Sequence, residues 1–339
     1  MSYRVRPARI GDLDAMFDMA KETGGGFTNL PMDRAALSEK LVRSVAAFGR
    51  AEEADGGDVF VFMLEHGETG QIAGTCQVFT RVGREHPFYS YRITRLTKTS
   101  PILRRTFDTE VLNLCTDFNN FSEVGGLFLR PEARAGGLGV MLARSRYLFI
   151  RANRARFTDK VVSELRGWLD AEGGSPFWDA IAGRFFGMSF QEADAFNAVH
   201  GTQFIADLMP TAPIYTAMLP ERAREVMRQP HQTGEVAKRM LEREGFSGEG
   251  YIDIFDGGPT MSAQTDNIRT VREARPLTLA SIGDSPGGER MLLAAGGLEN
   301  FASAFGNVDA APDGTAILDP ASAALLGLAP GDSFLAVGR

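Results

Sequence analysis

The stretch GGLFLRPEARAGGLG, residues 125–139, runs from an apolar segment through a glycine-rich turn into a helical pattern. It therefore predicts a strand, a turn and a helix in succession. Glycines let a backbone approach a ligand closely, and the unpaired N–H groups at the start of a helix attract anions. The stretch thus predicts a phosphate-binding turn, the alternative being a plain glycine turn without a ligand.

Three phosphate-binding patterns can be compared with this turn. A Walker loop requires Lys and then Ser or Thr after its last glycine, where this chain has apolar residues beginning with Val140. A dinucleotide fingerprint requires a third glycine where this chain has Leu142, together with a regular βαβ context. The remaining pattern, R/Q-x-x-G-x-G/A, matches Arg134, Gly137 and Gly139. It resembles the turn that holds the pyrophosphate of coenzyme A in the GNAT acyltransferases.

The composition is that of an ordinary globular protein. The chain has 339 residues, of which 44% are apolar and 23% charged, and its formal net charge is −7. This acidic balance argues against nucleic acid as a partner. Cys76 and Cys115 are too few for a disulfide framework or a cysteine-rich metal site. Because no signal peptide or membrane-length apolar stretch is visible, we expect a soluble, cytoplasmic protein without a membrane partner.

The order of the expected elements indicates an α+β fold with a mixed sheet rather than a regular βαβ repeat. The elements expected in the first half of the chain are a strand near residues 3–7, helices at 11–22 and after an Asp33 N-cap, a hairpin at 59–65 and 71–82, and strands at 88–96, 123–129 and 160–165, with a helix at about 138–154 between the last two. In that last helix, Val140, Ala143, Tyr147 and Ile150 form the expected buried stripe, and the arginines around them are expected to face solvent.

The rest of the chain divides at about residue 262. Residues 166–230 are interpreted as an insertion of helices and loops into a GNAT-like domain of residues 1–262, in which a helix ending at Gly245 and a strand at 251–255 follow. Residues 263–339 are expected to form a small β-rich domain. Its short apolar runs, at 277–282, 290–295, 315–318 and 333–337, alternate with turn residues, and Asp319 and Pro320 begin a short helix.

Longer motifs narrow the family. The segments KETGGGFTNLP, LFLRPEARAGGLGVMLARSRYLF, DKVVSELRG, SPFWDAIAGRFFGMSF and PHQTGEVAKRMLEREGF are together similar to arginine N-succinyltransferase, including the arginine/ornithine enzymes. The resemblance covers roughly residues 1–275, and beyond it only the β-rich character is similar. It implies transfer of a succinyl group from succinyl-CoA to the α-amino group of arginine, the first step of the succinyltransferase route of arginine catabolism.

The resemblance also implies site residues. His231, in the HQT segment, corresponds to the family's proton donor, and Leu127 to the residue at the succinyl-CoA site. The other three histidines are interpreted as surface or locally bonded residues. No permanently bound cofactor is expected, since succinyl-CoA is itself the acyl-donor substrate. No metal site is expected either, because the histidines are dispersed and none lies at ligand spacing with another. The residues expected to hold it are Leu127, Leu129, Arg134, Gly136, Gly137 and Gly139.

Candidates for the acceptor follow from chemistry. A guanidinium pairs bidentately with carboxylates, which favours Glu164, Asp253 and Asp256, although each is equally an ordinary strand or turn residue. The free carboxylate of a succinyl group requires a cation or a backbone anion nest. The candidates for that role are Arg92, Arg166 and the TGGGFTN loop with Thr28 and Asn29.

Alternatives remain open. The chain is either the enzyme just described, a GNAT acyltransferase with another acyl-CoA or another amine, or a CoA-binding subunit that works with a paralogous chain. We expect a homo-oligomer or a hetero-oligomer with such a paralogue. A nucleic-acid-binding role for residues 276–339 is disfavoured, because they carry few basic side chains.

Overall fold

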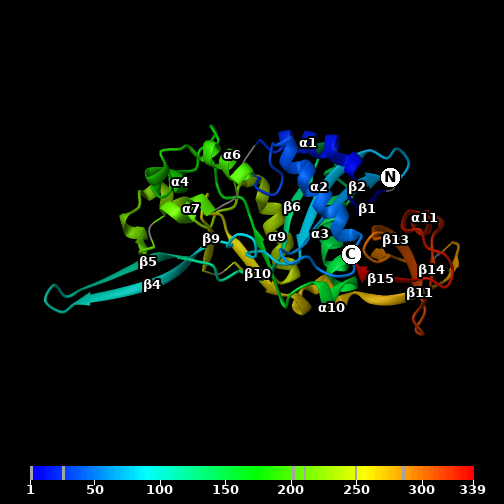
Figure 1. Cartoon of the computed structure of the whole chain (residues 1–339). Coiled ribbons are helices and arrows are strands. Elements are labelled where there is room, and N and C mark those ends of the chain that lie inside the picture. Colours follow the sequence, from blue (N-terminus) through cyan, green and yellow to red (C-terminus); the bar gives the residue numbers. More distant parts are fainter. Residues whose placement is uncertain (1–2, 25–26, 201–202, 210, 249, 285–287) are drawn as a thin grey trace.

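The structure is a computed structural model that describes residues 3–339 except 25–26, 201–202, 210, 249 and 285–287. The molecule is elongated (Figure 1). A central body carries the N-terminal helices, the C-terminal strands lie at one end, and a helical insertion with a long hairpin lies at the other. Within the described residues, no helix is long and apolar enough to cross a membrane.

The central body is a mixed sheet with helices on both faces. Its strands, in spatial order, are β10 (Thr260–Gln264), β7 (Lys160–Glu164), β6 (Ser122–Leu129), β3 (Ile72–Phe79), β2 (Val59–His66) and β1 (Tyr3–Pro7). In β2, Val61 packs against α1 (Leu13–Glu22) and α2 (Arg34–Phe48), whereas Phe62 packs on the opposite face with α3 (Leu138–Ala152). Because both faces of the sheet are covered here, the sequence of β2 is almost continuously apolar rather than alternating.

Local signals place the helices as expected. The Asp33 side chain accepts the Ala36 backbone N–H at 2.7 Å and so caps α2. Gly245 ends α9 (Glu235–Glu244) in the left-handed conformation, at φ 96°. Asp319 accepts the Ser322 backbone N–H and caps α11 (Pro320–Leu326). These three predictions are confirmed.

The prediction that the arginines of α3 face solvent is confirmed for Arg151 but is wrong for Arg144 and Arg146. Arg144 is 6% exposed and Arg146 is 3% exposed. Arg144 lies 3.2 Å from Glu244, and it donates hydrogen bonds to Thr270 Oγ1 and to the carbonyl oxygen of Gly338, both at 2.8 Å. Residues from the C-terminal half of the chain cover the side of α3 that was expected to be exposed to solvent. This contact joins residues far apart in the sequence, so no local pattern predicts it.

The C-terminal strands form a closed unit of their own. They are β13 (Ala302–Ala310), β12 (Glu289–Ala295), β15 (Ser333–Gly338), β11 (Arg275–Ile282) and β14 (Thr315–Leu318), and β14 pairs back with β13. A separate apolar core that includes Leu279, Leu293 and Phe334 fills this ring. The unit continues the main sheet through a single register pair, Val5 with Ser303.

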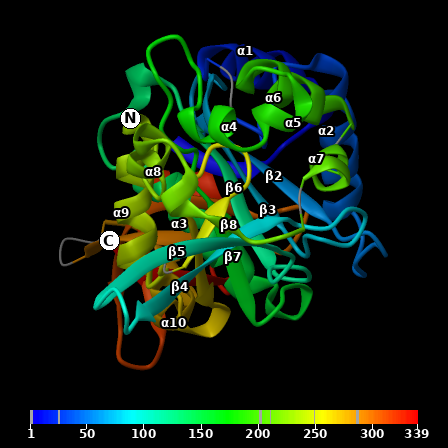
Figure 2. The same ribbon diagram turned by 90° about the vertical axis from the view of Figure 1, so that its left-hand side faces the viewer.

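The end of the molecule that carries the insertion has a second sheet (Figure 2), of which only β8 lies within residues 166–230. The insertion and this sheet share an apolar core of their own. That sheet has the order β8 (Ile214–Tyr215), β5 (Arg105–Cys115), β4 (Ser90–Ser100) and β9 (Tyr251–Asp253). The helices of the insertion are α4 (Pro176–Ala180), α5 (Gly183–Phe186), α6 (Phe190–His200), α7 (Gln203–Leu208) and α8 (Glu221–Val226). A further helix, α10 (Arg269–Glu273), lies outside the insertion and packs on α3. The strand predicted at 88–96 is present as β4, but its partner β5 and strand β13 were not predicted. In β5 the outer residues are mostly polar and exposed, so the alternation that indicates a strand is absent there.

Candidate active site

The glycine turn lies between β6 and α3, as predicted. Gly136 and Gly137 adopt left-handed conformations, at φ 65° and 85°, and Gly137 is the N-cap residue of α3. Other residues adopt such conformations only with strain. Gly139 lies in the first turn of the helix. The first N–H groups of a 15-residue helix therefore face this turn.

Two arginines lie at the turn. Arg134 donates from Nε to the carbonyl oxygen of Leu129 at 3.1 Å, so its side chain folds back over the end of β6. Arg339, which follows β15, donates from Nη2 to the carbonyl oxygen of Gly136 at 3.4 Å. A Cβ atom on Gly137 would lie 2.7 Å from the same Nη2 atom. Arg339 was not predicted at this turn, because 203 residues separate it from Gly136.

Strand β6 separates from β7 before it reaches the turn. Within these two fully described strands, the register pairs are Ser122 with Val161 and Glu123 with Val162. On the other side of β6, the register with β3 shifts between Thr75 and Gln77. The one extra residue of this bulge belongs to β6, where Gly126 and Leu127 lie opposite Cys76 and Gly126 has φ 56°. Splayed backbone of this kind presents groups to a ligand rather than to a neighbouring strand.

The glycines of β6 allow close approach. A Cβ atom on Gly125 would lie 2.4 Å from Asn29 Nδ2, and one on Gly126 would lie 2.7 Å from Gln77 Nε2. The amide side chains of Asn29 and Gln77 therefore lie directly against the bulged strand. Leu127, the next residue, is half-buried at the same bulge. Any larger residue at 125 or 126 would push these side chains away.

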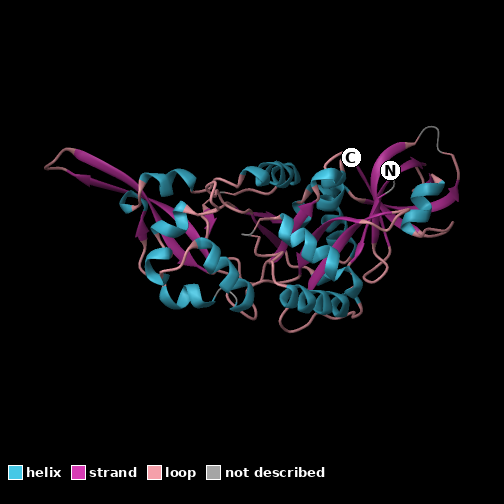
Figure 3. Ribbon diagram, turned by 90° about the horizontal axis from the view of Figure 1, so that it is seen from above, coloured by secondary structure: helices cyan, strands magenta, loops and turns pink. Residues whose placement is uncertain are grey.

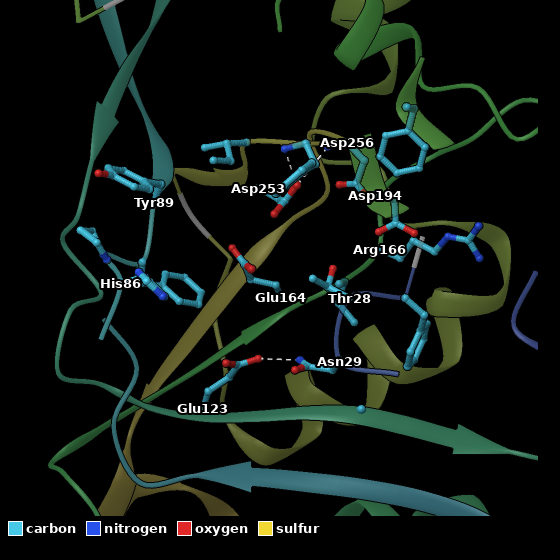
Figure 4. A pocket seen from close by; sticks show the side chains of 18 residues that line it. Thr28, Asn29, His86, Tyr89, Glu123, Glu164, Arg166, Asp194, Asp253 and Asp256 are labelled. Atoms are coloured by element: carbon cyan, nitrogen blue, oxygen red, sulfur yellow. Dashed lines mark hydrogen bonds between the residues drawn. The ribbon is translucent and has the colours of Figure 1, made fainter. Parts of the chain in front are cut away.

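A pocket of about 240 Å³ opens beside this bulge (Figure 4). It lies between the central body and the insertion, and Gly126 lines it together with Thr28 and Asn29. Acidic side chains dominate its polar lining. The acidic residues are Glu123, Glu164, Asp194, Asp253 and Asp256, and the arginine among them is Arg166.

These carboxylates differ in how they are bound. Asp256 accepts the backbone N–H groups of Gly167 and Gly258, at 2.6 and 2.9 Å. Asp253 accepts the backbone N–H groups of Phe255 and Asp256, at 2.6 and 3.0 Å. Both aspartates therefore hold the local chain in shape. Glu164, in contrast, accepts a 3.2 Å hydrogen bond from the Thr260 hydroxyl, which leaves much of its carboxylate available.

Burial sets the protonation of the cluster. It raises the pKa of Glu164 well above the ordinary value, and the charge of Asp253 raises this pKa further. Burial also raises the pKa of Asp256 well above its ordinary value, again with a contribution from Asp253. Buried carboxylates that share one pocket favour their neutral forms unless a cation is nearby. The pocket therefore suits a positively charged group.

Glu123 is held by the loop after α1. Asn29 Nδ2 donates to Glu123 Oε1 at 2.9 Å, while the carbonyl oxygen of Asn29 accepts from Gln77 Nε2 at 2.8 Å and from Lys40 Nζ at 2.7 Å. Burial raises the pKa of Glu123, whereas the Asn29 hydrogen bond and the charge of Lys40 oppose that rise. Burial in turn lowers the pKa of Lys40 to about 8. Gly25 and Gly26 of this loop lie outside the described residues.

His231 lies behind one wall of the pocket. Its backbone N–H donates to the carbonyl oxygen of Arg166 at 2.7 Å, and Arg166 lines the pocket. The ring atom Nδ1 lies 2.8 Å from Thr233 Oγ1 and accepts the Thr233 backbone N–H at 3.3 Å. The neutral imidazole therefore carries its proton on Nε2. Burial, and then the charge of Arg166, lower the pKa of His231.

The predicted residues are thus only partly brought together. Strand β6 joins the glycine turn at one end to the pocket at the other, and Thr28, Asn29, Glu164, Asp253 and Asp256 all line that pocket. Arg92 does not line it: its Nη1 lies 3.3 Å from Asp117 on the exposed side of β4. Three lining residues were not predicted, namely Glu123, Asp194 and His86, of which His86 was interpreted as a surface histidine. Within the described residues, no three His, Cys, Asp or Glu side chains are arranged to hold a metal ion.

A strand that splays from its neighbour at a bulge and leads through a glycine turn into a helix is the arrangement of a GNAT-type acyltransferase. Comparison with known proteins makes the assignment more specific. A family model described as the arginine N-succinyltransferase beta subunit matches residues 3–270, and one for the C-terminal domain of that subunit matches residues 275–338. The chain belongs to the arginine N-succinyltransferase family.

Individual relatives agree with this assignment. An arginine N-succinyltransferase of Escherichia coli O17:K52:H18 is 41% identical over 277 residues, which cover 81% of this chain and 80% of the relative. The enzyme of E. coli K12 is 40% identical over the same length. The solved structure of arginine/ornithine succinyltransferase subunit AI from Pseudomonas aeruginosa aligns with a TM-score of 0.91 at 31% identity, covering 99% of this chain and 98% of that one.

Proposed function

We propose that the chain transfers the succinyl group of succinyl-CoA to the α-amino group of L-arginine, with ornithine as a second acceptor, in arginine catabolism. The observation that carries this proposal is the acidic pocket beside the bulge of β6. A carboxylate-lined pocket suits a cationic amino acid, and the splayed strand beside it suits the thioester arm of an acyl-CoA. The family membership supports the same reaction.

The coenzyme follows β6. Its pyrophosphate lies at Gly136, Gly137 and the N-terminus of α3, with Arg134 as a cation beside it. Arg339 contributes a second positive charge at the same turn. The pantetheine arm then runs along the gap between β6 and β7, past Leu129 towards the bulge. This path places the thioester carbonyl oxygen at the backbone N–H of Leu127.

The acceptor occupies the acidic pocket. Its guanidinium pairs with Glu164, the carboxylate that has a single side-chain donor, while Asp253 and Asp256 shape the pocket wall. The free carboxylate of the succinyl group pairs with Arg166, whose Nε atom is buried and has no hydrogen-bond partner among the described residues. This arrangement explains why one arginine lies among several acids.

The acceptor nitrogen must lose two protons in all, and the departing thiolate must gain one. The α-ammonium group must lose a proton before its nitrogen attacks, and Glu123 is placed to accept it because it lies on β6 beside the bulge and has a raised pKa. The N–H of Leu127 stabilises the oxyanion as the C–N bond forms, and one such donor contributes about 3 kcal/mol. The nitrogen that has attacked still carries one proton too many. His231 accepts this proton and, as the imidazolium, gives it to the thiolate when the C–S bond breaks, which yields CoA and N2-succinylarginine.

A matrix of donors and acceptors tests the proposal. Succinyl-CoA and acetyl-CoA are assayed against arginine, ornithine and lysine, with release of the CoA thiol as readout. We expect the highest kcat/KM for succinyl-CoA with arginine. A preference for acetyl-CoA, or for lysine, would point to a different GNAT reaction.

The Pseudomonas relative is named as a subunit, which keeps a paired assembly as a second candidate. In that case the chain binds CoA but needs a paralogous chain for turnover. Isothermal calorimetry with CoA, beside the activity assay, separates the two cases. Binding without turnover by the isolated chain, followed by activity when the paralogue is added, favours the paired assembly.

A further inference from the structure

The β4–β5 hairpin extends far beyond the sheet that contains it (Figures 1 and 3). Its register pairs run from Ser90 with Cys115 to Ser100 with Arg105. Strand β9 pairs only along Ser90–Arg92, and β8 pairs only along 111–112. Residues 96–109, here named the arm, therefore have no flanking strand in the part of the chain that the structure describes. Five pairs at about 3.4 Å per residue give a projection of about 17 Å.

The supporting contacts end where the arm begins. The Ile93 backbone N–H donates to Gly250, and the Thr216 hydroxyl and Arg228 both bind Glu110, all at the base of the hairpin. The apolar core of the insertion includes Ile93 and Leu112 but no residue of the arm. A two-stranded ribbon without a core is marginally stable in water. An ordered arm of this length is therefore best explained by a surface that it contacts.

The arm presents apolar side chains to solvent. Ile102 is 94% exposed, Leu103 is 75% exposed and Phe107 is 46% exposed. Ile102 and Leu103 form the tip of the ribbon, and Phe107 lies opposite Lys98 on the adjoining face. Three large apolar residues on one narrow projection are unusual for a surface that stays in water. Apolar side chains gathered on an exposed surface mark an interaction site.

The arm is also basic on an acidic protein. Residues 90–110 carry five Lys or Arg and two Asp or Glu, although the whole chain has a net charge of −7. Arg92 and Arg95 pair with acids at 3.3 and 3.6 Å. Among the described residues, no ion pair holds Arg104 or Arg105 at the tip. The tip therefore combines apolar anchors with unpaired cations, and it suits a partner that is acidic.

We propose that the arm binds the body of a second copy of this chain. A second copy supplies the acidic surface that the charge of the arm requires, and a twofold axis lets each copy give one arm and receive one. Such an exchange doubles the contact, which helps it reach the roughly 800 Å² per partner of a stable interface. Nucleic acid and anionic membrane offer negative charge as well, and the test below includes both.

The test is the oligomeric state of the full chain. Sedimentation equilibrium at about 10 μM is expected to give twice 36.8 kDa for the natural sequence. The double variant Ile102→Asp, Leu103→Asp is expected to raise the dimer dissociation constant at least about 100-fold. The matched control is Val42→Asp, which places the same charge at a 54% exposed apolar residue of the body, and it is expected to leave the dimer intact.

A second variant protects the test against misfolding. Residues 96–109 are replaced by an Asn-Gly turn that joins Arg95 to Glu110, and circular dichroism confirms the fold. This variant is expected to be monomeric. A monomeric natural chain, a dimer that survives both arm variants, or assembly that appears only with a different polypeptide, with DNA or with anionic vesicles would each overturn the proposal.

Discussion

Asn29 Nδ2 donates a 2.9 Å hydrogen bond to Glu123 Oε1 and so joins the loop after α1 to the strand that carries the bulge. The contact spans 94 residues of sequence. It opposes the effect of burial, which raises the pKa of Glu123. The loop therefore adjusts the basicity of a carboxylate that lies beside the proposed acyl site.

Replacing Glu123 by Gln is expected to lower kcat by at least about 100-fold, because a general base contributes 10²–10⁴-fold. As a base, Glu123 acts only when deprotonated, so activity rises with pH through its raised pKa. The Asn29→Ala variant removes the stabilising donor and should shift that acidic limb of kcat/KM to higher pH. The pH profile of kcat/KM is measured for Asn29→Ala and for the natural enzyme from about pH 5 to 9. If the acidic limb of the profile does not move, Glu123 is not the general base.

His231→Ala is expected to lower kcat by at least about 100-fold while CoA binding and the melting temperature stay close to those of the natural chain. The physical reason is loss of the group that protonates the departing thiolate. Thr233→Val is the matched control, because it removes the hydroxyl beside Nδ1 but keeps the imidazole. A near-normal kcat for His231→Ala rules out its role as proton donor.

Glu164→Gln should raise KM for arginine at least about 10-fold, since it replaces a charged partner of the guanidinium by a neutral group of the same shape. Binding of CoA, measured by calorimetry, is expected to stay unchanged. Thr260→Val serves as control because it removes the donor to Glu164 without removing its charge. Equal effects of both variants would assign Glu164 a structural role instead.

Arg339→Ala is expected to raise KM for succinyl-CoA about 10-fold with little change in kcat, because one phosphate contact of about 1.4 kcal/mol is lost. Succinyl-pantetheine, which lacks the nucleotide, should be used equally well by the variant and the natural chain. The control is Arg272→Ala, an exposed arginine that pairs with Glu273. Loss of activity with both donors would show that Arg339 acts through the fold rather than the phosphates.

The Arg144–Glu244 pair is buried, with both side chains under 10% exposed. Glu244→Ala leaves Arg144 charged and unpaired in the interior, and we expect the free energy of unfolding to fall by about 3–5 kcal/mol. Glu273→Ala breaks an exposed pair with Arg269 and should cost less than about 1 kcal/mol. Urea unfolding measures the free energy of unfolding of both variants. Similar losses of stability in the two would contradict the expected difference between the buried and the exposed ion pair.

Local sequence signals predicted the elements that position the site. An apolar run, two glycines with positive φ and a helical pattern were enough for β6, the turn and α3. Cap residues such as Asp33 and Gly245 were equally reliable, because their effect is confined to one helical turn. Strand β5 was missed because its outer half is exposed on both faces, so no alternation of apolar and polar residues marks it.

The sequence by itself determined the strand, glycine turn and helix, the histidine before α9 and the family to which they belong. Tertiary structure alone decided which acids share a pocket, that Asn29 holds Glu123, and that Arg339 reaches Gly136. The reason is physical: caps and turns depend on neighbours along the chain, whereas burial and raised pKa values depend on groups that folding brings together. A carboxylate in a sequence shows its charge, but only the fold shows what surrounds it.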